Sequence, residues 1–218
     1  MKYSSHAQYI NDKQIEVPSV TTILKILNKP SINKWANYLG FKREKIDDVL
    51  KFSADKGTEV HYMLHAFLFQ MKYIFVESDN GVTKDYLIKV LDNFISWSGD
   101  HTIKPIFGEK SITCDLFGGT VDLYCELDGI PTILDFKTSK SFYSSMFLQL
   151  SAYTYMMEML DYEVEQVCIL LINEKMCKHK ILKRDELDKY IATFLILTKL
   201  FYQIYELNED WGDLLEKK

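Results

Sequence analysis

The chain has 218 residues, of which 47% are hydrophobic and 26% are charged, a balance that is ordinary for a globular protein. Its 9 glycines and 4 prolines exclude a collagen-like or linker-rich chain, and its formal net charge of −5 excludes a globally basic nucleic-acid-binding protein. Only Arg43 and Arg184 are arginines, and the other basic residues are lysines. Any nucleic-acid binding is therefore expected to use a local patch of lysines that contacts phosphates rather than bases.

The sequence shows no sign of a membrane protein or of a secreted one. The N-terminal segment lacks the apolar core of a signal peptide, and the longest apolar stretch, 191–205, is interrupted by Lys199 and is too short to span a bilayer. We therefore expect an intracellular protein that does not contact membranes. No C-x-x-C pair is present, so neither a zinc site nor a disulfide framework is expected. Buried free thiols are expected at all four cysteines: Cys114, Cys125, Cys168 and Cys177.

The first hundred residues have the pattern of helices. Ser19 is placed to cap a helix over 20–27, and Ser31 is placed to cap a second helix over 32–39 that Gly40 would end. A longer helix is expected from 53 or 57 to 70, and another over 83–97, because apolar residues recur there at helical spacing.

The pattern changes near residue 100. Residues 101–137 are rich in β-branched and aromatic residues with interspersed glycines, which predicts strands and hairpins, with Gly118–Gly119 as one of the turns. A helix (142–160), a buried strand (164–172), its hairpin partner (176–182) and a long amphipathic helix (184–208) follow.

This order predicts an α/β fold, with a central mixed sheet built on an antiparallel hairpin and flanked by helices. We expect a single domain, with a mainly helical lobe over 1–100, a sheet core that carries the active site over 101–182, and a C-terminal helix over 183–218.

The hairpin around Asp128–Gly129 carries the chemistry. Asp-Gly between two alternating runs predicts a two-residue turn, so that Leu127 pairs with Ile130. The same register places Asp122 opposite Asp135, with Cβ atoms roughly 4.5–5.5 Å apart. One face is then apolar: Val121, Leu123, Cys125, Leu127, Leu134 and Phe136. The other face is mainly polar: Asp122, Tyr124, Glu126, Asp135 and Lys137.

Two opposed carboxylates destabilise a sheet unless a proton, a basic neighbour or a bound cation relieves their repulsion. An oxygen-rich pair favours Mg²⁺ or Mn²⁺ over zinc. Lys137 points to the same face as Asp135 and is placed to orient or deprotonate a bound water. A solvated hairpin face with alternating charges is the competing interpretation, because short charged motifs occur often by chance.

Four motifs occur in order along the chain: GTEVH at 57–61, GGTVD at 118–122, LDFK at 134–137 and QLSAY at 149–153. Together they resemble the RecB-like branch of the PD-(D/E)XK nuclease superfamily. The segment PSVTTIL at 18–24 further resembles the opening of mitochondrial genome maintenance exonucleases and their phage relatives. The resemblance implies a restriction-endonuclease-like fold and a DNA nuclease that depends on Mg²⁺ or Mn²⁺.

The resemblance also implies a set of metal ligands. His61 matches the histidine ligand, Asp122 the aspartate that bridges to the metal, and Asp135 the acidic ligand of the D-x-K pair. The backbone carbonyl of Phe136 is a further candidate ligand. Glu109 is a candidate outer-sphere or second-metal group. An ordinary buried histidine is the competing interpretation of His61.

Three further residues match catalytic positions of the same family, besides Asp122 and Asp135. Lys137 matches the lysine that positions the attacking water, and Gln149 and Tyr153 match the Q-x-x-x-Y pair near it. Gln149 and Tyr153 lie four residues apart on one helical face, where a partly buried polar pair is the competing interpretation.

Other features bear on the substrate. Lys42, Arg43, Lys45, Lys51 and Lys56 form a basic cluster that is either a solvated face or a phosphate-binding patch. Aromatic residues of the helical lobe are candidates for base stacking, although most such residues belong to a core. They are Trp35, Tyr38 and Tyr62.

No cysteine precedes Cys114, so no iron–sulfur cluster of the kind found in some relatives is expected. No P-loop is present either, so no nucleotide is expected. The leading hypothesis is an exonuclease that acts on single-stranded or unwound DNA ends, in replication, recombination or repair, and leaves 5′-phosphate and 3′-hydroxyl products. A helicase or a single-strand-binding or annealing protein is a candidate partner. The alternatives are a structure-selective endonuclease for flaps or junctions and a non-catalytic nucleic-acid-binding module on a nuclease scaffold.

Overall fold

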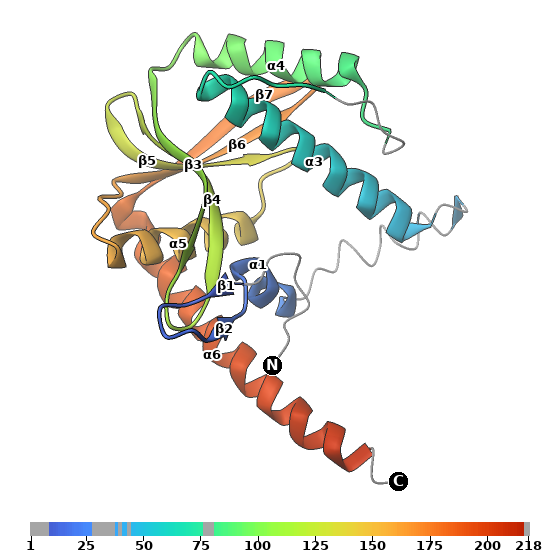
Figure 1. Ribbon diagram of the computed structural model, residues 1–218, viewed down its shortest axis with the longest axis vertical. Helices are drawn as coiled ribbons and strands as arrows, with labels where there is room; N and C mark the ends of the chain where they lie inside the picture. The colour runs from blue at the N-terminus through green and yellow to red at the C-terminus, as the bar shows by residue number, and fades with distance from the viewer. Residues whose placement is uncertain (1–8, 28–37, 39–40, 43–44, 76–80, 216–218) are drawn as a thin grey trace.

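The computed structural model describes residues 9–27, 38, 41–42, 45–75 and 81–215, with 207–215 as backbone only. A five-stranded mixed sheet lies at the centre, and helices pack on both of its faces (Figure 1). This arrangement confirms the predicted α/β class. The helix expected over 32–39 lies outside the described residues. No helix in the described part of the chain combines the length and the apolar character that crossing a bilayer requires.

The sheet has the spatial order β3-β4-β5-β6-β7. Its strands are β3 (Ile103–Thr113), β4 (Gly118–Leu127), β5 (Ile130–Lys137), β6 (Gln166–Asn173) and β7 (Met176–Lys183). The β5–β6 pair is parallel and the others are antiparallel. Helix α5 (Ser144–Met159) makes the crossover between the two parallel strands. The β6 strand is buried along its whole length, as its apolar sequence predicts.

Two hydrophobic clusters hold the helices to the sheet. Helices α3 (Ile46–Leu68) and α4 (Lys84–Ser98) pack on one face against apolar residues of β4, β5 and β6. Helices α1 (Val20–Ile23), α5 and α6 (Arg184–Leu215) pack on the other, with the short 3₁₀ helix η1 (Leu24–Ile26). The N-terminal helices are therefore divided between the two faces.

Local signals explain where most helices begin. The Ser19 hydroxyl caps α1 by accepting a 3.0 Å hydrogen bond from the Thr22 N–H, and Thr83 caps α4 in the same way. Helix α3 begins before the expected 53 or 57, and its first turn carries Asp47 and Asp48, which favour a helix N-terminus.

The N-terminal segment also forms a hairpin that the sequence did not predict. Strands β1 (Tyr9–Ile10) and β2 (Glu16–Val17) pair with each other and lie beside the beginning of β4 (Figure 1). Each strand has two residues, too short for an alternating pattern to be recognised.

The predicted turn at Gly118–Gly119 is wrong. The β3–β4 turn lies at 114–117, where the Cys114 N–H donates to the Phe117 carbonyl oxygen at 2.9 Å, and both glycines lie inside β4. Their role is close packing. A Cβ on Gly118 would lie 2.6 Å from Tyr9, and a Cβ on Gly119 would lie 2.4 Å from Tyr153.

The cysteines are free thiols, as expected, but only two of them are buried. Cys125 and Cys168 are fully buried in the cluster beneath α3 and α4, and burial raises the pKa of Cys125 to about 12. Cys114 and Cys177 are half-buried. Their burial is less complete than the sequence predicted.

We expect Gly119→Ala to lower the free energy of unfolding by about 1–3 kcal/mol, because the added methyl group would collide with the buried Tyr153 ring. Gly57→Ala is the matched control, since the nearest atom to its added Cβ is Thr138 Oγ1 at 3.8 Å. Alanine in a helix interior is also more stable than glycine by up to about 1 kcal/mol, so Gly57→Ala on α3 should not be destabilised. Urea denaturation measures both changes. A Gly119→Ala protein as stable as the wild type would contradict this packing.

Candidate active site

The β4–β5 hairpin has the predicted register. Pairing runs from Leu127–Ile130 to Leu123–Leu134 and ends there, one pair before Asp122 would face Asp135. Beyond that point, the Asp122 carboxylate accepts a 3.0 Å hydrogen bond from the Phe136 N–H. A side chain thus takes the place of the backbone ladder where the two strands separate.

Strand β4 changes its face pattern at Asp122. Val121 and Tyr124 both pack in the cluster with α5, while Leu123 packs in the cluster beneath α3. Two consecutive residues, Asp122 and Leu123, therefore turn toward α3. The expectation that Val121 shares a face with Leu123 is wrong, because strict alternation does not persist through this irregular part of the strand.

The neighbouring strand β3 is irregular at the same level. Phe107 and Lys110 both contact the ring of Tyr162, so alternation is interrupted between them. Glu109 has a φ of 49°, a left-handed conformation that a non-glycine residue rarely adopts. This conformation accompanies the turn of the Glu109 side chain toward α3. Backbone strain of this kind is often found at functional sites.

The result is a compact group of three candidate ligands, His61 on α3, Glu109 on β3 and Asp122 on β4. The His61 Nδ1 atom lies 3.4 Å from Asp122 Oδ2 and 3.9 Å from Glu109 Oε1. One ligand atom from each residue lies within 4.8 Å of the others, which is close enough for one metal ion. The group joins three elements that are distant in sequence.

The hydrogen bond on the other side of the His61 ring sets the orientation of its lone pair. Nε2 lies 2.8 Å from the Phe136 carbonyl oxygen. A carbonyl oxygen only accepts, so Nε2 carries the hydrogen, and in the neutral ring Nδ1 presents its lone pair to Glu109 and Asp122. Either a proton on Nδ1 or a metal cation between Nδ1 and the two carboxylates would satisfy this arrangement. The Phe136 carbonyl oxygen was expected as a candidate metal ligand. In this structure it accepts the hydrogen bond from His61 Nε2.

The charge of this group is reflected in the pKa of Glu109. Partial burial raises this pKa, and the nearby Asp122 carboxylate raises it further, whereas His61 opposes the shift. A bound divalent cation would remove the electrostatic part of that penalty.

Asp135, which is buried, and Lys137, which is half-buried, form an ion pair beside the group. The Asp135 carboxyl is 1% exposed, and the Lys137 Nζ lies 2.7 Å from both of its oxygens but donates a hydrogen bond only to Oδ1. Burial raises the pKa of Asp135 to about 6, and Asp122 adds to the shift while Lys137 opposes it. Burial favours a lower pKa for Lys137, but the two aspartates outweigh this and raise it.

Asp135 Oδ2 is a buried oxygen that accepts no hydrogen bond. The Lys137 ammonium, 2.7 Å from this oxygen, offsets part of its desolvation cost, and a metal cation would offset the rest. Together with the His61 lone pair, this oxygen indicates that the residues present fit a divalent cation. Carboxylate oxygens suit Mg²⁺ or Mn²⁺, and the imidazole extends the set to other transition metals.

Gln149 and Tyr153 lie together on α5, as predicted. Gln149 Nε2 donates a 2.8 Å hydrogen bond to the Tyr153 hydroxyl oxygen. Tyr153 is buried and its ring packs on Gly119. Burial raises the pKa of Tyr153 well above its usual value, and the negative charges of Asp122 and Asp135 act in the same direction. Tyr153 is therefore a neutral phenol near the Asp122 and Asp135 carboxylates.

The aromatic and basic candidates of the helical segment are only partly described. Trp35 and Arg43 lie outside the described residues. Tyr38 and Tyr62 are 52% and 53% exposed, so both remain candidates for base stacking. The ammonium of Lys56 instead lies over the Tyr86 ring at 3.8 Å.

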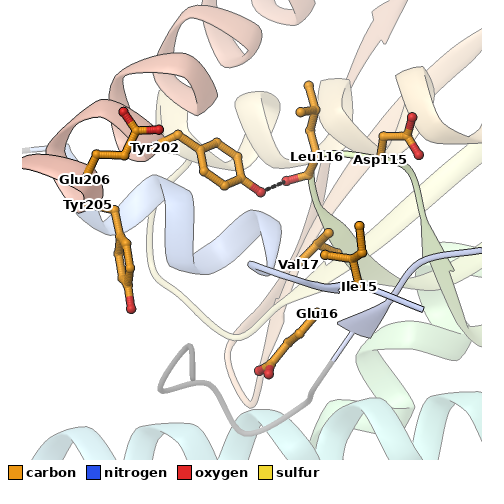
Figure 2. Close-up of a pocket in the computed structure, with 8 residues that line it drawn as sticks. All are labelled: Ile15, Glu16, Val17, Asp115, Leu116, Tyr202, Tyr205 and Glu206. Atoms are coloured by element: carbon orange, nitrogen blue, oxygen red, sulfur yellow. Dashed lines mark hydrogen bonds between the residues drawn. The ribbon is translucent and has the colours of Figure 1, made fainter. Parts of the chain in front are cut away.

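A cavity of about 480 Å³ lies away from these residues, between β2, the β3–β4 turn and α6 (Figure 2). Its lining residues are Ile15, Glu16, Val17, Asp115, Leu116, Tyr202, Tyr205 and Glu206. The Tyr202 hydroxyl donates a 2.7 Å hydrogen bond to the Leu116 carbonyl oxygen, which ties α6 to the turn (Figure 2). The cavity shares no residue with the candidate active site.

Neither protein-family models nor curated protein sequences give a match to this chain. Among solved structures, it is similar to the crystal structure of a phage-related exonuclease from Haemophilus somnus 129PT, with 14% sequence identity and a TM-score of 0.39. The similarity covers 88% of this chain and 96% of that one.

We expect Mn²⁺ to raise the thermal midpoint of the wild-type protein, since an ion that binds only the native state at 100 times its Kd adds about 2.7 kcal/mol of stability. Asp122→Asn should lose most of this effect. Its metal-free stability should persist, because the amide oxygen can still accept the hydrogen bond from the Phe136 N–H.

The control for this titration is Asp100→Asn, which alters an exposed carboxylate outside the group. EDTA should reverse the stabilisation. Equal Mn²⁺ responses of wild type and Asp122→Asn would contradict the proposed ligand set.

Proposed function

We propose that this protein is a divalent-metal-dependent nuclease that hydrolyses phosphodiester bonds of DNA, acting as an exonuclease on single-stranded or unwound ends. The observation that carries the proposal is the convergence of His61, Glu109 and Asp122 beside the Asp135–Lys137 ion pair. Binding nucleic acid alone would require no such group, because phosphates are bound well by cations without carboxylates.

The residues divide into two roles in this proposal. His61, Glu109 and Asp122 hold the cation, and Asp135 completes the negative charge around it. When bound, the cation would supply Lewis-acid polarisation of the phosphate and a lower pKa of water. Lys137 supplies an ammonium donor that aligns the attacking water and offsets charge on the phosphate, and Asp135 fixes the position of that ammonium.

The neighbouring helix α5 supports the proposed phosphodiester hydrolysis. Gln149 orients the Tyr153 hydroxyl, and Tyr153 in turn occupies the space above Gly119, three residues before Asp122, the last residue of the GGTVD motif. These contacts restrict the first part of β4, on which Asp122 lies. We assign Gln149 and Tyr153 a positioning role for Asp122 and the substrate strand.

We expect end-labelled single-stranded DNA to be shortened in Mg²⁺ or Mn²⁺ and to remain intact in EDTA. Lys137→Ala should lower the cleavage rate by about 10²–10⁴-fold, because the ammonium that positions the attacking water is lost. Lys140→Ala is the control, since Lys140 is an exposed lysine three residues further along. Time courses on denaturing gels measure the rates.

A circular single strand and an RNA strand complete this assay. An exonuclease leaves the circle intact, whereas cleavage of the circle would reassign the protein as an endonuclease. Thermal midpoints of both lysine variants confirm that they are folded. Absence of cleavage on every substrate, with Mn²⁺ still stabilising the fold, would refute the nuclease proposal.

A further inference from the structure

Three hydroxyl groups form a continuous row next to the candidate metal group. Ser111 on β3 and Thr120 on β4 are paired across the two strands, and their hydroxyl oxygens lie 3.2 Å apart. The Tyr9 hydroxyl of β1 lies 3.0 Å from Thr120 Oγ1. Nothing in the sequence motifs singles out Ser111 or Tyr9, because the row joins three strands that only the fold brings together.

The row lies on the same face of the sheet as the ligands. Ser111 is two residues beyond Glu109 on β3, and Thr120 is two residues before Asp122 on β4. Residues two apart share a face and are separated by about 7 Å along a strand. Lys110 and Val121, which lie between them, point to the other face of the sheet, Lys110 toward Tyr162 and Val121 into the cluster with α5.

Counting hydroxyl protons shows that the row keeps one free donor. Each of the three hydroxyls carries one proton, and the row contains two hydrogen bonds. One proton is therefore left over in every arrangement of the bonds. Tyr9 is 9% exposed and Ser111 is exposed, so the accessible end of the row is at Ser111.

Neutral hydroxyl donors of this kind commonly bind phosphate oxygens of nucleic acids without reading bases. A cationic ligand would find no carboxylate within the row itself. An anion beside Glu109 and Asp122 would be repelled in the metal-free protein, but a cation held by these residues would reverse the local charge.

We propose that Ser111, Thr120 and Tyr9 form a phosphate-binding subsite that takes the phosphate next to the one being hydrolysed. The inference rests on the proposed function and extends it to the position of the substrate strand. The phosphate is either an internal phosphodiester or a terminal monophosphate. Both present the same oxygens to the row, and the test separates them.

The experiment measures equilibrium binding of a fluorescent oligonucleotide in Ca²⁺, chosen as the probe metal to slow cleavage. Ser111→Ala removes the accessible hydroxyl without disturbing the core, and Thr120→Val removes the central one at nearly constant shape. We expect each to weaken binding about tenfold or more, as for lost hydrogen bonds to a charged group. Thr193→Val on α6 is the matched control, because it removes a hydroxyl outside the row.

Salt dependence provides a readout that a merely structural role would not produce. The lost donors are neutral, so affinity should fall while the slope of log Kd against log salt concentration stays unchanged. A deficit confined to oligonucleotides with a terminal phosphate would assign the subsite to strand ends. A deficit that persists without a terminal phosphate would assign it to an internal phosphodiester.

Wild-type affinity in Ser111→Ala and Thr120→Val would overturn the subsite. So would a lower thermal midpoint with unchanged affinity, because the row would then serve only to dock β1. If the wild type cleaves DNA and the variants bind normally, the subsite alone fails. If the wild type neither binds nor cleaves, the proposed function fails with it.

Discussion

Glu109, Asp122 and Asp135 lie so close together that the Asp122 charge raises the pKa of each of the other two. Two of these carboxylates approach His61 and the third pairs with Lys137, so the protein only partly compensates the negative charge. Repulsion of this kind opposes folding, and it is retained only where the surrounding structure enforces it. The sheet irregularities, the half-buried Lys137 and the glycine contacts can all be understood as parts of that enforcement.

The backbone conformation helps to position these carboxylates as much as the side-chain contacts do. The left-handed conformation of Glu109 and the change of face at Asp122 bring both carboxylates to the α3 side, where a regular pair of strands would alternate past them. The end of the β4–β5 ladder frees the Phe136 N–H for Asp122 and leaves the Phe136 carbonyl oxygen for His61. One residue of β5 thereby orients two of the three candidate ligands.

The sequence predicted the parts that depend on local patterns. Asp128–Gly129 gave the hairpin register, Ser19 gave the cap of α1, and the apolar run of β6 indicated a fully buried strand. It did not predict the irregular face pattern at Asp122, because alternation is a rule about regular strands and the irregularity depends on two strands together. The prediction of a turn at Gly118–Gly119 was wrong because glycine is equally suited to a turn and to close packing under an aromatic ring. Only the tertiary contacts decide between these uses.

Those two glycines connect distant segments to the candidate site. Tyr9 of β1 packs on Gly118, and Tyr153 of α5 packs on Gly119. The first residues of β4 are thus restrained by both rings, and the same strand continues through Thr120 to Asp122. Catalytic groups need their supporting contacts held within fractions of an ångström. Glycines that admit two tyrosine rings satisfy that need by letting the N-terminal hairpin and α5 fix one short stretch of backbone. The GGTVD motif therefore has a packing role at its beginning and carries the candidate ligand Asp122 at its end.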